Sequence, residues 1–104
     1  MLISATVDEI AGGLFGDGLR ATIVRLLAEE QLCTCHLVEL TGARQPTVSH
    51  HLRVLREAGL VEAIPDGRFT YYRLLEGPLA ALRDEVGALA AAAARAPRRR
   101  RPCE

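Results

Sequence analysis

Two cysteines separated by one residue, Cys33 and Cys35, are the side chains of this sequence best suited to chemistry. A close pair of thiolates can chelate a soft ion, and it can also be oxidised as a redox sensor. The sequence has 3 cysteines, an odd number that argues against a framework of structural disulfides. In a reducing compartment, neighbouring thiols act more often as ligands or sensors. We therefore expect Cys33 and Cys35 to bind a metal or metalloid ion, or to respond to oxidation.

The third thiol, Cys103, lies near the C-terminus. About eight residues follow Arg95, and at roughly 3.3 Å per residue they can extend about 26 Å. This reach would let Cys103 complete a metal site with the cysteine pair, either in its own chain or across a dimer. We count Cys103 as a third metal ligand on this basis. The other nearby donor, His36, follows Cys35 directly, and we expect its side chain to face solvent.

The spacing of the cysteine pair sets a condition on ion binding. Residues i and i+2 point about 200° apart around a helix, but they point to one side of an extended segment. The sequence predicts a short helix over Thr34 to Leu40, with Leu37 and Leu40 facing the core. Cys33 and Cys35 therefore cannot hold one ion while both are helical, so we expect binding to distort the start of this helix.

A pattern typical of DNA-reading proteins follows. Gly42 marks a turn after the short helix, and a longer helix is predicted over Gln45 to Ala58, with Pro46 in its first turn. Val48, Leu52 and Leu55 form the buried face of this longer helix. The residues left to face DNA are polar or basic, and we expect them to contact base edges or phosphates: Gln45, Thr47, Ser49, His50 and Arg53.

A β-hairpin is predicted next, with strands over Leu60 to Ile64 and Phe69 to Leu74 and a turn at Asp66-Gly67. The hairpin would bring Arg68 to the DNA backbone or minor groove. Helix, turn, helix and hairpin in this order predict a mainly α fold with a β-hairpin wing, a winged helix-turn-helix. His51, which is adjacent to His50, is expected to pack in the core, since neighbouring helix positions cannot chelate one ion.

The remaining helices are expected to form a dimer. Val7, Ile10 and Leu14 fall on one face of an N-terminal helix, and Arg20 to Ala28 form the next helix. After Gly77-Pro78, a last helix carries an apolar seam with heptad spacing, which is typical of helix pairing. The seam consists of Leu79, Leu82, Val86, Leu89 and Ala93. We expect residues 1–96 to form one DNA-binding and dimerisation domain and 97–104 to form a flexible arginine-rich tail carrying Cys103.

Composition agrees with a DNA-binding protein of the cytoplasm. The formal net charge is 0, yet residues 44–73 hold five arginines against three acidic residues. A basic nucleic-acid face can therefore lie within a neutral total. No apolar run approaches the roughly 20 residues that span a bilayer, and the N-terminus lacks the features of a signal peptide. We expect a cytoplasmic protein that does not contact a membrane.

Several stretches resemble the ArsR/SmtB family of metal-responsive repressors, over roughly residues 8 to 75. They are Asp17 to Leu27, Leu32 to Leu37, Gln45 to Val61 and Asp66 to Arg73, with Val48 to Val61 the most specific. The resemblance implies a homodimer that represses its own operon and leaves operator DNA when a toxic ion binds. It also implies that Gln45, Ser49 and His50 face the major groove. Arg44 departs from the pattern, because relatives often have a capping serine there.

The resemblance further implies that a Cys-x-Cys at this position senses arsenite or antimonite. Relatives often carry another cysteine one turn later, where this chain has Val38-Glu39. The zinc site of the family's terminal helix uses acid and histidine pairs, and this helix has Asp84 and Glu85 but no histidine. We expect As(III) as the inducer, then Sb(III), with a soft divalent ion (Cd, Pb or Zn) or thiol oxidation as alternatives.

Catalysis is disfavoured by the surroundings of the thiols. A small arsenate reductase acting through Cys33 would need an anion cradle beside that thiol, such as a glycine-rich turn with arginine. The segment Leu32 to His36 contains neither. The sequence therefore predicts a regulator and not an enzyme.

Overall fold

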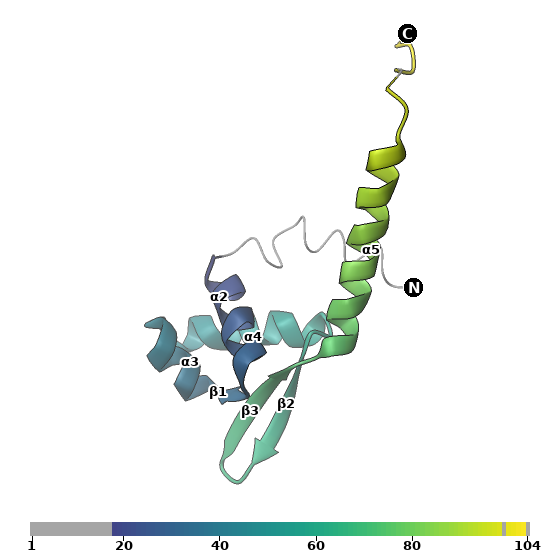
Figure 1. Ribbon diagram of the computed structural model, residues 1–104. Coiled ribbons are helices and arrows are strands. Elements are labelled where there is room, and N and C mark those ends of the chain that lie inside the picture. The colour runs from purple at the N-terminus through teal and green to yellow at the C-terminus, as the bar shows by residue number, and fades with distance from the viewer. Residues whose placement is uncertain (1–17, 99, 104) are drawn as a thin grey trace.

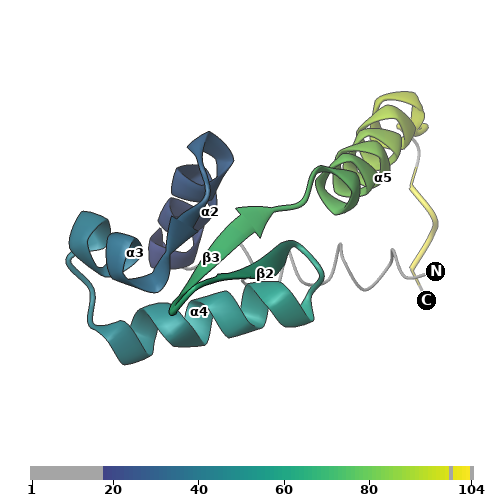
Figure 2. The ribbon, with the colours of Figure 1, turned by 90° about the horizontal axis from the view of Figure 1, so that it is seen from below.

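The computed structural model describes residues 18–98 and 100–103 of the 104-residue chain. Three helices form a compact body, from which a β-hairpin and a long C-terminal helix project in different directions (Figures 1 and 2). The helix predicted around Val7, Ile10 and Leu14 lies outside the described residues. The elements are α2 (Gly18–Glu29), β1 (Leu32–Cys33), α3 (Thr34–Thr41), α4 (Gln45–Glu57), β2 (Val61–Asp66), β3 (Phe69–Leu74) and α5 (Glu76–Arg95).

The core is built almost entirely from aliphatic side chains, with α3 packed against both α2 and α4. Ile23 of α2, Leu37 of α3 and Leu55 of α4 are completely buried. Val48 and Leu52 are also buried, which confirms the predicted inner face of α4. The prediction for Leu40 is wrong, because 57% of this residue is exposed. α3 is only two turns long, so a residue three positions after Leu37 already points past the edge of the core.

The turn between α3 and α4 has the predicted conformation. Gly42 adopts a left-handed backbone with φ of 74°, and its N–H donates a 2.9 Å hydrogen bond to the Val38 carbonyl. Glycine takes this conformation without the steric penalty of a Cβ atom. α4 then begins at Gln45, after an N-cap residue, Arg44, whose side chain makes no capping hydrogen bond. The missing cap agrees with the departure from the family pattern at Arg44.

The sheet has three strands in the order β1-β3-β2, one more than the sequence predicted. β2 and β3 form the expected antiparallel hairpin, but its turn is at Gly67 and Arg68, one residue later than predicted, because Asp66 still pairs with Phe69 in the ladder. The extra strand, β1, has only two residues, and its Leu32 and Cys33 pair with Tyr72 and Tyr71 of β3. The start of α3 is therefore tied directly to the wing.

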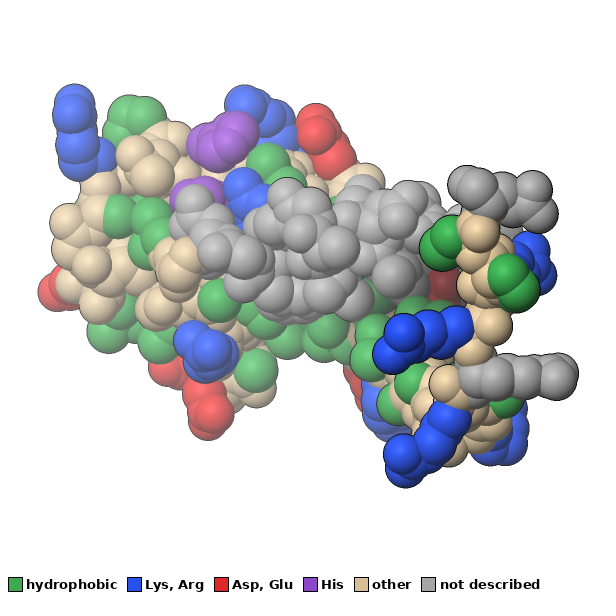
Figure 3. Space-filling model, turned by 90° about the horizontal axis from the view of Figure 1, so that it is seen from above, with side chains coloured by type: hydrophobic (Ala, Val, Ile, Leu, Met, Phe, Trp, Pro, Cys, Tyr) green, Lys and Arg blue, Asp and Glu red, His purple; other side chains and the backbone are tan. Residues whose placement is uncertain are grey.

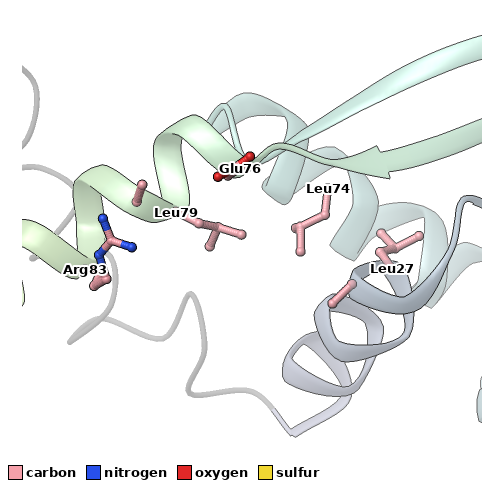
Figure 4. Close-up of a pocket in the computed structure, with 7 residues that line it drawn as sticks. Leu27, Leu74, Glu76, Leu79 and Arg83 are labelled. Atoms are coloured by element: carbon pink, nitrogen blue, oxygen red, sulfur yellow. The ribbon is translucent and has the colours of Figure 1, made fainter.

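α5 leaves the body soon after the hairpin, and among its described residues only Leu82 is buried. Farther along the predicted seam, Val86 and Leu89 are 45% and 55% exposed. A hollow of about 440 Å³ separates the start of α5 from the end of α2. Leu27, Leu74 and Leu79 point into this hollow in Figure 4. None of the described helices is both long and apolar enough to cross a membrane.

Leu37 and Leu40 of α3 differ in burial, so substituting each of them tests how α3 packs into the core. Leu37→Ala should destabilise the fold by about 2 to 5 kcal/mol, because it removes a fully buried side chain and leaves a cavity. Leu40→Ala, the matched control, should change the stability by no more than about 0.5 kcal/mol, because its side chain is largely exposed. Urea unfolding followed by circular dichroism measures both. Equal destabilisation by the two substitutions would contradict this packing.

Candidate functional site

The exposed face of α4 carries every helix residue that the sequence placed toward DNA. Four of its residues, Val48, His51, Leu52 and Leu55, are buried and anchor the helix to the body. This anchoring leaves the opposite face to solvent, and the exposed residues there include Gln45, Thr47, Ser49, His50 and Arg53. The Nη2 atom of Arg53 lies 3.1 Å from Nδ1 of His50, so two of these side chains are already in contact.

His51 has a different role from its neighbour. It is 5% exposed, and its Nδ1 accepts a 3.0 Å hydrogen bond from Nε of Arg20 on α2. His51 therefore joins α4 to α2, as the sequence predicted when it placed this residue in the core. In Figure 3, histidine and arginine side chains lie side by side along one edge of the body. The edge presents hydrogen-bond donors and positive charge together, as a DNA-reading surface needs.

The wing adds a further basic group. Arg68 is exposed at the turn of the hairpin, next to Gly67 with its φ of 63°. Nearer the base of the hairpin, Arg73 of β3 pairs with Glu62 of β2, so its charge is partly neutralised. Arg68 is thus an exposed cation at the tip of the wing, where the sequence predicted a contact with a DNA phosphate or the minor groove.

The second group of candidate residues lies at the N-terminal end of α3. Sulfur atoms of Cys33 and Cys35 and a ring nitrogen of His36 all lie within 4.8 Å of one another. Cys33 is not helical: it is the N-cap of α3, with φ of −89° and ψ of 170°. The extended backbone turns its thiol toward the first helical turn, where Cys35 lies. The condition that the sequence set for ion binding, that the two cysteines are not both helical, is therefore met, because Cys33 lies just before α3. A shift of the start of α3 on ion binding stays a prediction.

The position of His36 also differs from the expectation that it faces solvent. The ring folds back onto the N-cap, where its Nδ1 accepts a 3.1 Å hydrogen bond from the backbone N–H of Cys33 and lies 3.3 Å from Cys33 Sγ. Cys33 Sγ in turn faces the backbone N–H of His36, so the two residues form a capping box. Its sequence signal was a polar residue three positions after the cap residue, but cysteine is not among the usual cap residues.

The environment separates the two thiols chemically. Burial acts to raise the pKa of the Cys33 thiol, but hydrogen bonds from the Cys35 thiol and from backbone N–H groups of the first turn lower that pKa below its ordinary value. The hydrogen bond to Cys33 raises the pKa of Cys35, and the negative charge on Cys33 adds to this effect. Cys33 is buried and Cys35 is exposed. The pair thus combines a buried thiol whose pKa is lowered with an exposed thiol, an arrangement suited to capturing a soft ion.

Cys103 is not part of this cluster. It is exposed at the end of the chain, beyond α5, whereas α3 and β1 belong to the body at the other end of the molecule (Figure 1). Among the described residues, the group with metal-binding geometry at α3 consists of Cys33, Cys35 and His36 alone. A role for Cys103 would require a different placement of the tail or a thiol from a second chain.

The sequence is similar to bacterial transcriptional regulators over the region that contains the cysteine pair and α4. A family model described as bacterial regulatory protein, arsR family, matches residues 17–63, which include the cysteine pair and α4. The chain is 40% identical over 63 residues to an uncharacterized HTH-type transcriptional regulator of Methanocaldococcus jannaschii, covering 60% of this chain and 71% of that protein.

Two further proteins show similarity over different lengths. The chain is 42% identical over 59 residues to the arsenic resistance transcriptional regulator ArsR1 of Pseudomonas putida, which covers 56% of this chain and 46% of the relative. It thus spans about half the length of that protein. The NMR structure of a homodimeric winged helix-turn-helix DNA-binding domain from Mycobacterium bovis superposes with a TM-score of 0.64 at 29% identity, covering 94% of this chain and 93% of that one.

Proposed function

The chain belongs to the arsR family of bacterial regulatory proteins, and we propose that it is a homodimeric repressor released from DNA when a thiophilic ion binds Cys33 and Cys35. As a member of this family, it is a DNA-binding transcriptional regulator with a winged helix-turn-helix fold, and not an enzyme. The observation that carries the proposal is the approach of the two thiols to within 4.8 Å at the start of α3. α3 packs directly against α4, which carries the DNA-facing side chains.

The proposed switch follows from this packing. An ion held by Cys33 and Cys35 pulls on the N-cap and first turn of α3, while Leu37, one helical turn farther on, is completely buried in the core shared with α4. A shift of α3 therefore acts on the position of α4. An effector changes DNA affinity only if it binds the DNA-competent and DNA-incompetent arrangements with different affinity. Strain transmitted from α3 to α4 would provide that difference.

In the proposed complex, α4 enters the major groove. Gln45 suits adenine because its amide can pair bidentately with that base, and Thr47, Ser49 and His50 can reach base edges or phosphates. Arg53 and Arg68 supply positive charge on α4 and on the wing, respectively. Binding to two half-sites requires two copies of α4, and the apolar face at Val86 and Leu89 would join two chains.

Arsenite is the proposed inducer, followed by antimonite. Trivalent arsenic binds preferentially to thiolates, and the cysteines of this site can provide thiolate ligands. Support also comes from the similarity to the arsenic resistance regulator ArsR1 of Pseudomonas putida. Cys103 remains the proposed third thiolate, provided by the tail of either chain. A soft divalent ion is the alternative inducer at the same thiols.

Thiol oxidation is a second candidate function, favoured by the proximity of the Cys33 thiol, whose pKa is lowered, to the exposed Cys35 thiol. The two inducers can be separated by how DNA binding is restored. After release by arsenite, a chelating dithiol should restore binding but a phosphine reductant should not. If the phosphine alone restores binding, and arsenite has no effect in its presence, the ion-sensing proposal fails in favour of oxidation.

The wing contact can be tested through salt dependence. Each lost phosphate contact reduces the slope of log K against log salt by about 0.9, so Arg68→Ala should reduce it by roughly 1.8 in a dimer with two wings. Arg83→Ala is the matched control, because Arg83 is exposed on α5, away from the reading surface, and contacts Asp84 at 3.2 Å. Fluorescence anisotropy with labelled duplex at several salt concentrations measures both slopes. An unchanged slope for Arg68→Ala would rule out the wing contact.

A further inference from the structure

Arg44 is the residue through which the chain enters α4, and arginine is unusual at such a position. It is the N-cap of α4, with an extended backbone of φ −74° and ψ 150°, and its side chain makes no capping hydrogen bond. Serine, threonine, aspartate and asparagine are favoured at an N-cap because their side chains accept hydrogen bonds from the first turn. A guanidinium only donates hydrogen bonds. The Arg44 side chain is therefore available for a contact other than capping.

The first turn of α4 needs little from a capping side chain. Such a side chain accepts a hydrogen bond from the N–H of the second or third helical residue, here Pro46 and Thr47. Pro46 has no backbone N–H, and the Thr47 N–H donates a 3.1 Å hydrogen bond to the Arg44 carbonyl. The Val48 N–H donates to the same carbonyl, also at 3.1 Å. Because the Arg44 backbone already satisfies this turn, an arginine side chain here costs little stability.

The turn before Arg44 holds its backbone in place. The Thr41 hydroxyl donates a 2.6 Å hydrogen bond to the Leu37 carbonyl and accepts a 3.2 Å hydrogen bond from the Ala43 N–H. Ala43 also packs against the core. The Arg44 side chain therefore starts from a well-defined point at the N-terminal end of α4.

The guanidinium of Arg44 has no partner in its own chain. The residue is exposed, and within the part of the chain that the structure describes, no hydrogen bond or ion pair involves its side chain. Arg53, farther along α4, is by contrast 3.1 Å from a ring nitrogen of His50. In helix-turn-helix proteins, the N-terminal residues of the recognition helix contact base edges. Arg44 thus brings an unpaired cation to the end of α4 where base contacts are expected.

We propose that Arg44 contacts a guanine in the major groove and makes that guanine a preferred base at one position of each operator half-site. Guanine presents its O6 and N7 acceptors in the major groove, and two N–H groups of a guanidinium can pair with both. A good bidentate pair discriminates against the wrong base by about 5- to 150-fold. The inference rests on the proposed entry of α4 into the major groove and adds a base preference to it.

The test removes one acceptor atom from the DNA at a time. In a duplex selected for tight binding by the wild type, 7-deazaguanine replaces each guanine in turn, at the equivalent positions of both half-sites. This base keeps its pairing with cytosine but has no N7 acceptor. Fluorescence anisotropy gives the affinities of the wild type, of Arg44→Ser and of the matched control Arg83→Ser, which removes an exposed arginine from α5.

At one guanine position, 7-deazaguanine should weaken binding by the wild type and by Arg83→Ser at least about fivefold. Arg44→Ser should bind the unmodified duplex at least about fivefold more weakly than the wild type, and it should lose less than about twofold more at that guanine. Its melting temperature should equal or exceed that of the wild type, because serine is a favoured N-cap residue.

Full sensitivity of Arg44→Ser to 7-deazaguanine would overturn the guanine contact, and weaker binding with that sensitivity intact would assign Arg44 to a phosphate. A wild type that is insensitive at every guanine, or a lower melting temperature of Arg44→Ser, would also overturn the proposal. The experiment uses no inducer, so its failure is distinguishable from a failure of release by arsenite.

Discussion

Arsenite should have no effect on DNA binding by a Cys33→Ser, Cys35→Ser variant, whereas it should weaken DNA binding by the wild type at least about tenfold. Coupling between an effector site and a second site typically changes affinity by about 5- to 150-fold. This coupling depends on the two thiolates, which are the soft ligands at the start of α3. Serine keeps the size of the side chain but offers only a hydroxyl, which is a poor ligand for a soft ion.

Single substitutions separate loss of the ligand from loss of structure. Cys35 is exposed, so Cys35→Ser should leave stability and unliganded DNA affinity unchanged while abolishing the response. Cys33 is buried at the N-cap, so its substitution carries some risk to the fold, and thermal unfolding of each variant checks this point. Cys103→Ser should alter only the affinity for arsenite if the tail supplies a thiolate. A Cys35→Ser variant that still responds fully to arsenite would contradict the proposed site.

Charge on the apolar face of α5 should separate the dimer. Val86 and Leu89 are 45% and 55% exposed in one chain, and they lie one turn apart on the seam that begins at Leu79. Two glutamates in the paired seam would be buried without partners, and buried unpaired charges are strongly unfavourable. Val86→Glu, Leu89→Glu should therefore be monomeric. Two linked DNA-binding domains bind about 10²- to 10⁴-fold more tightly than one. The DNA affinity of the monomeric variant should therefore fall at least about 100-fold.

Ala88→Glu, Ala91→Glu is the matched control for this prediction. These alanines have the same three-residue spacing and are exposed, but they lie on the opposite side of α5. Sedimentation velocity should show a dimer for the control and the wild type, and a monomer for the seam variant. Circular dichroism checks that the helices remain in both. A seam variant that still sediments as a dimer would show that another surface joins the chains.

The helix α4, its buried face and the turn before it could be predicted almost completely from the sequence. Val48, Leu52 and Leu55 recur with helical spacing, and burial of these three residues determines which polar residues of α4 face solvent. Gly42 and Gly67 mark turns because both positions need a positive φ, which the structure shows at 74° and 63°. These are local signals, so they can be detected without knowledge of the tertiary contacts.

The geometry around Cys33, Cys35 and His36 was predicted less well, because it depends on a part of the chain that is distant in sequence. β1 is only two residues long and exists through pairing of Leu32 and Cys33 with Tyr72 and Tyr71. No local pattern indicates so short a strand. The pairing keeps Cys33 extended, which places its thiol beside Cys35 and leaves its N–H for His36. The predicted start of the helix at Thr34 is correct, but the expectation that His36 faces solvent was wrong, because nothing in the sequence indicated the pairing that leaves the Cys33 N–H to the His36 ring.

Release of this regulator from DNA by a thiophilic ion at Cys33 and Cys35 can be measured directly. The most direct measurement is fluorescence anisotropy of the wild-type protein on a duplex selected for tight binding, titrated with arsenite in excess phosphine reductant. Anisotropy should fall to that of free DNA, at arsenite concentrations stoichiometric with the protein or a small multiple above, and a chelating dithiol should restore it. Full DNA binding at every arsenite concentration would show that arsenite does not release this protein from DNA.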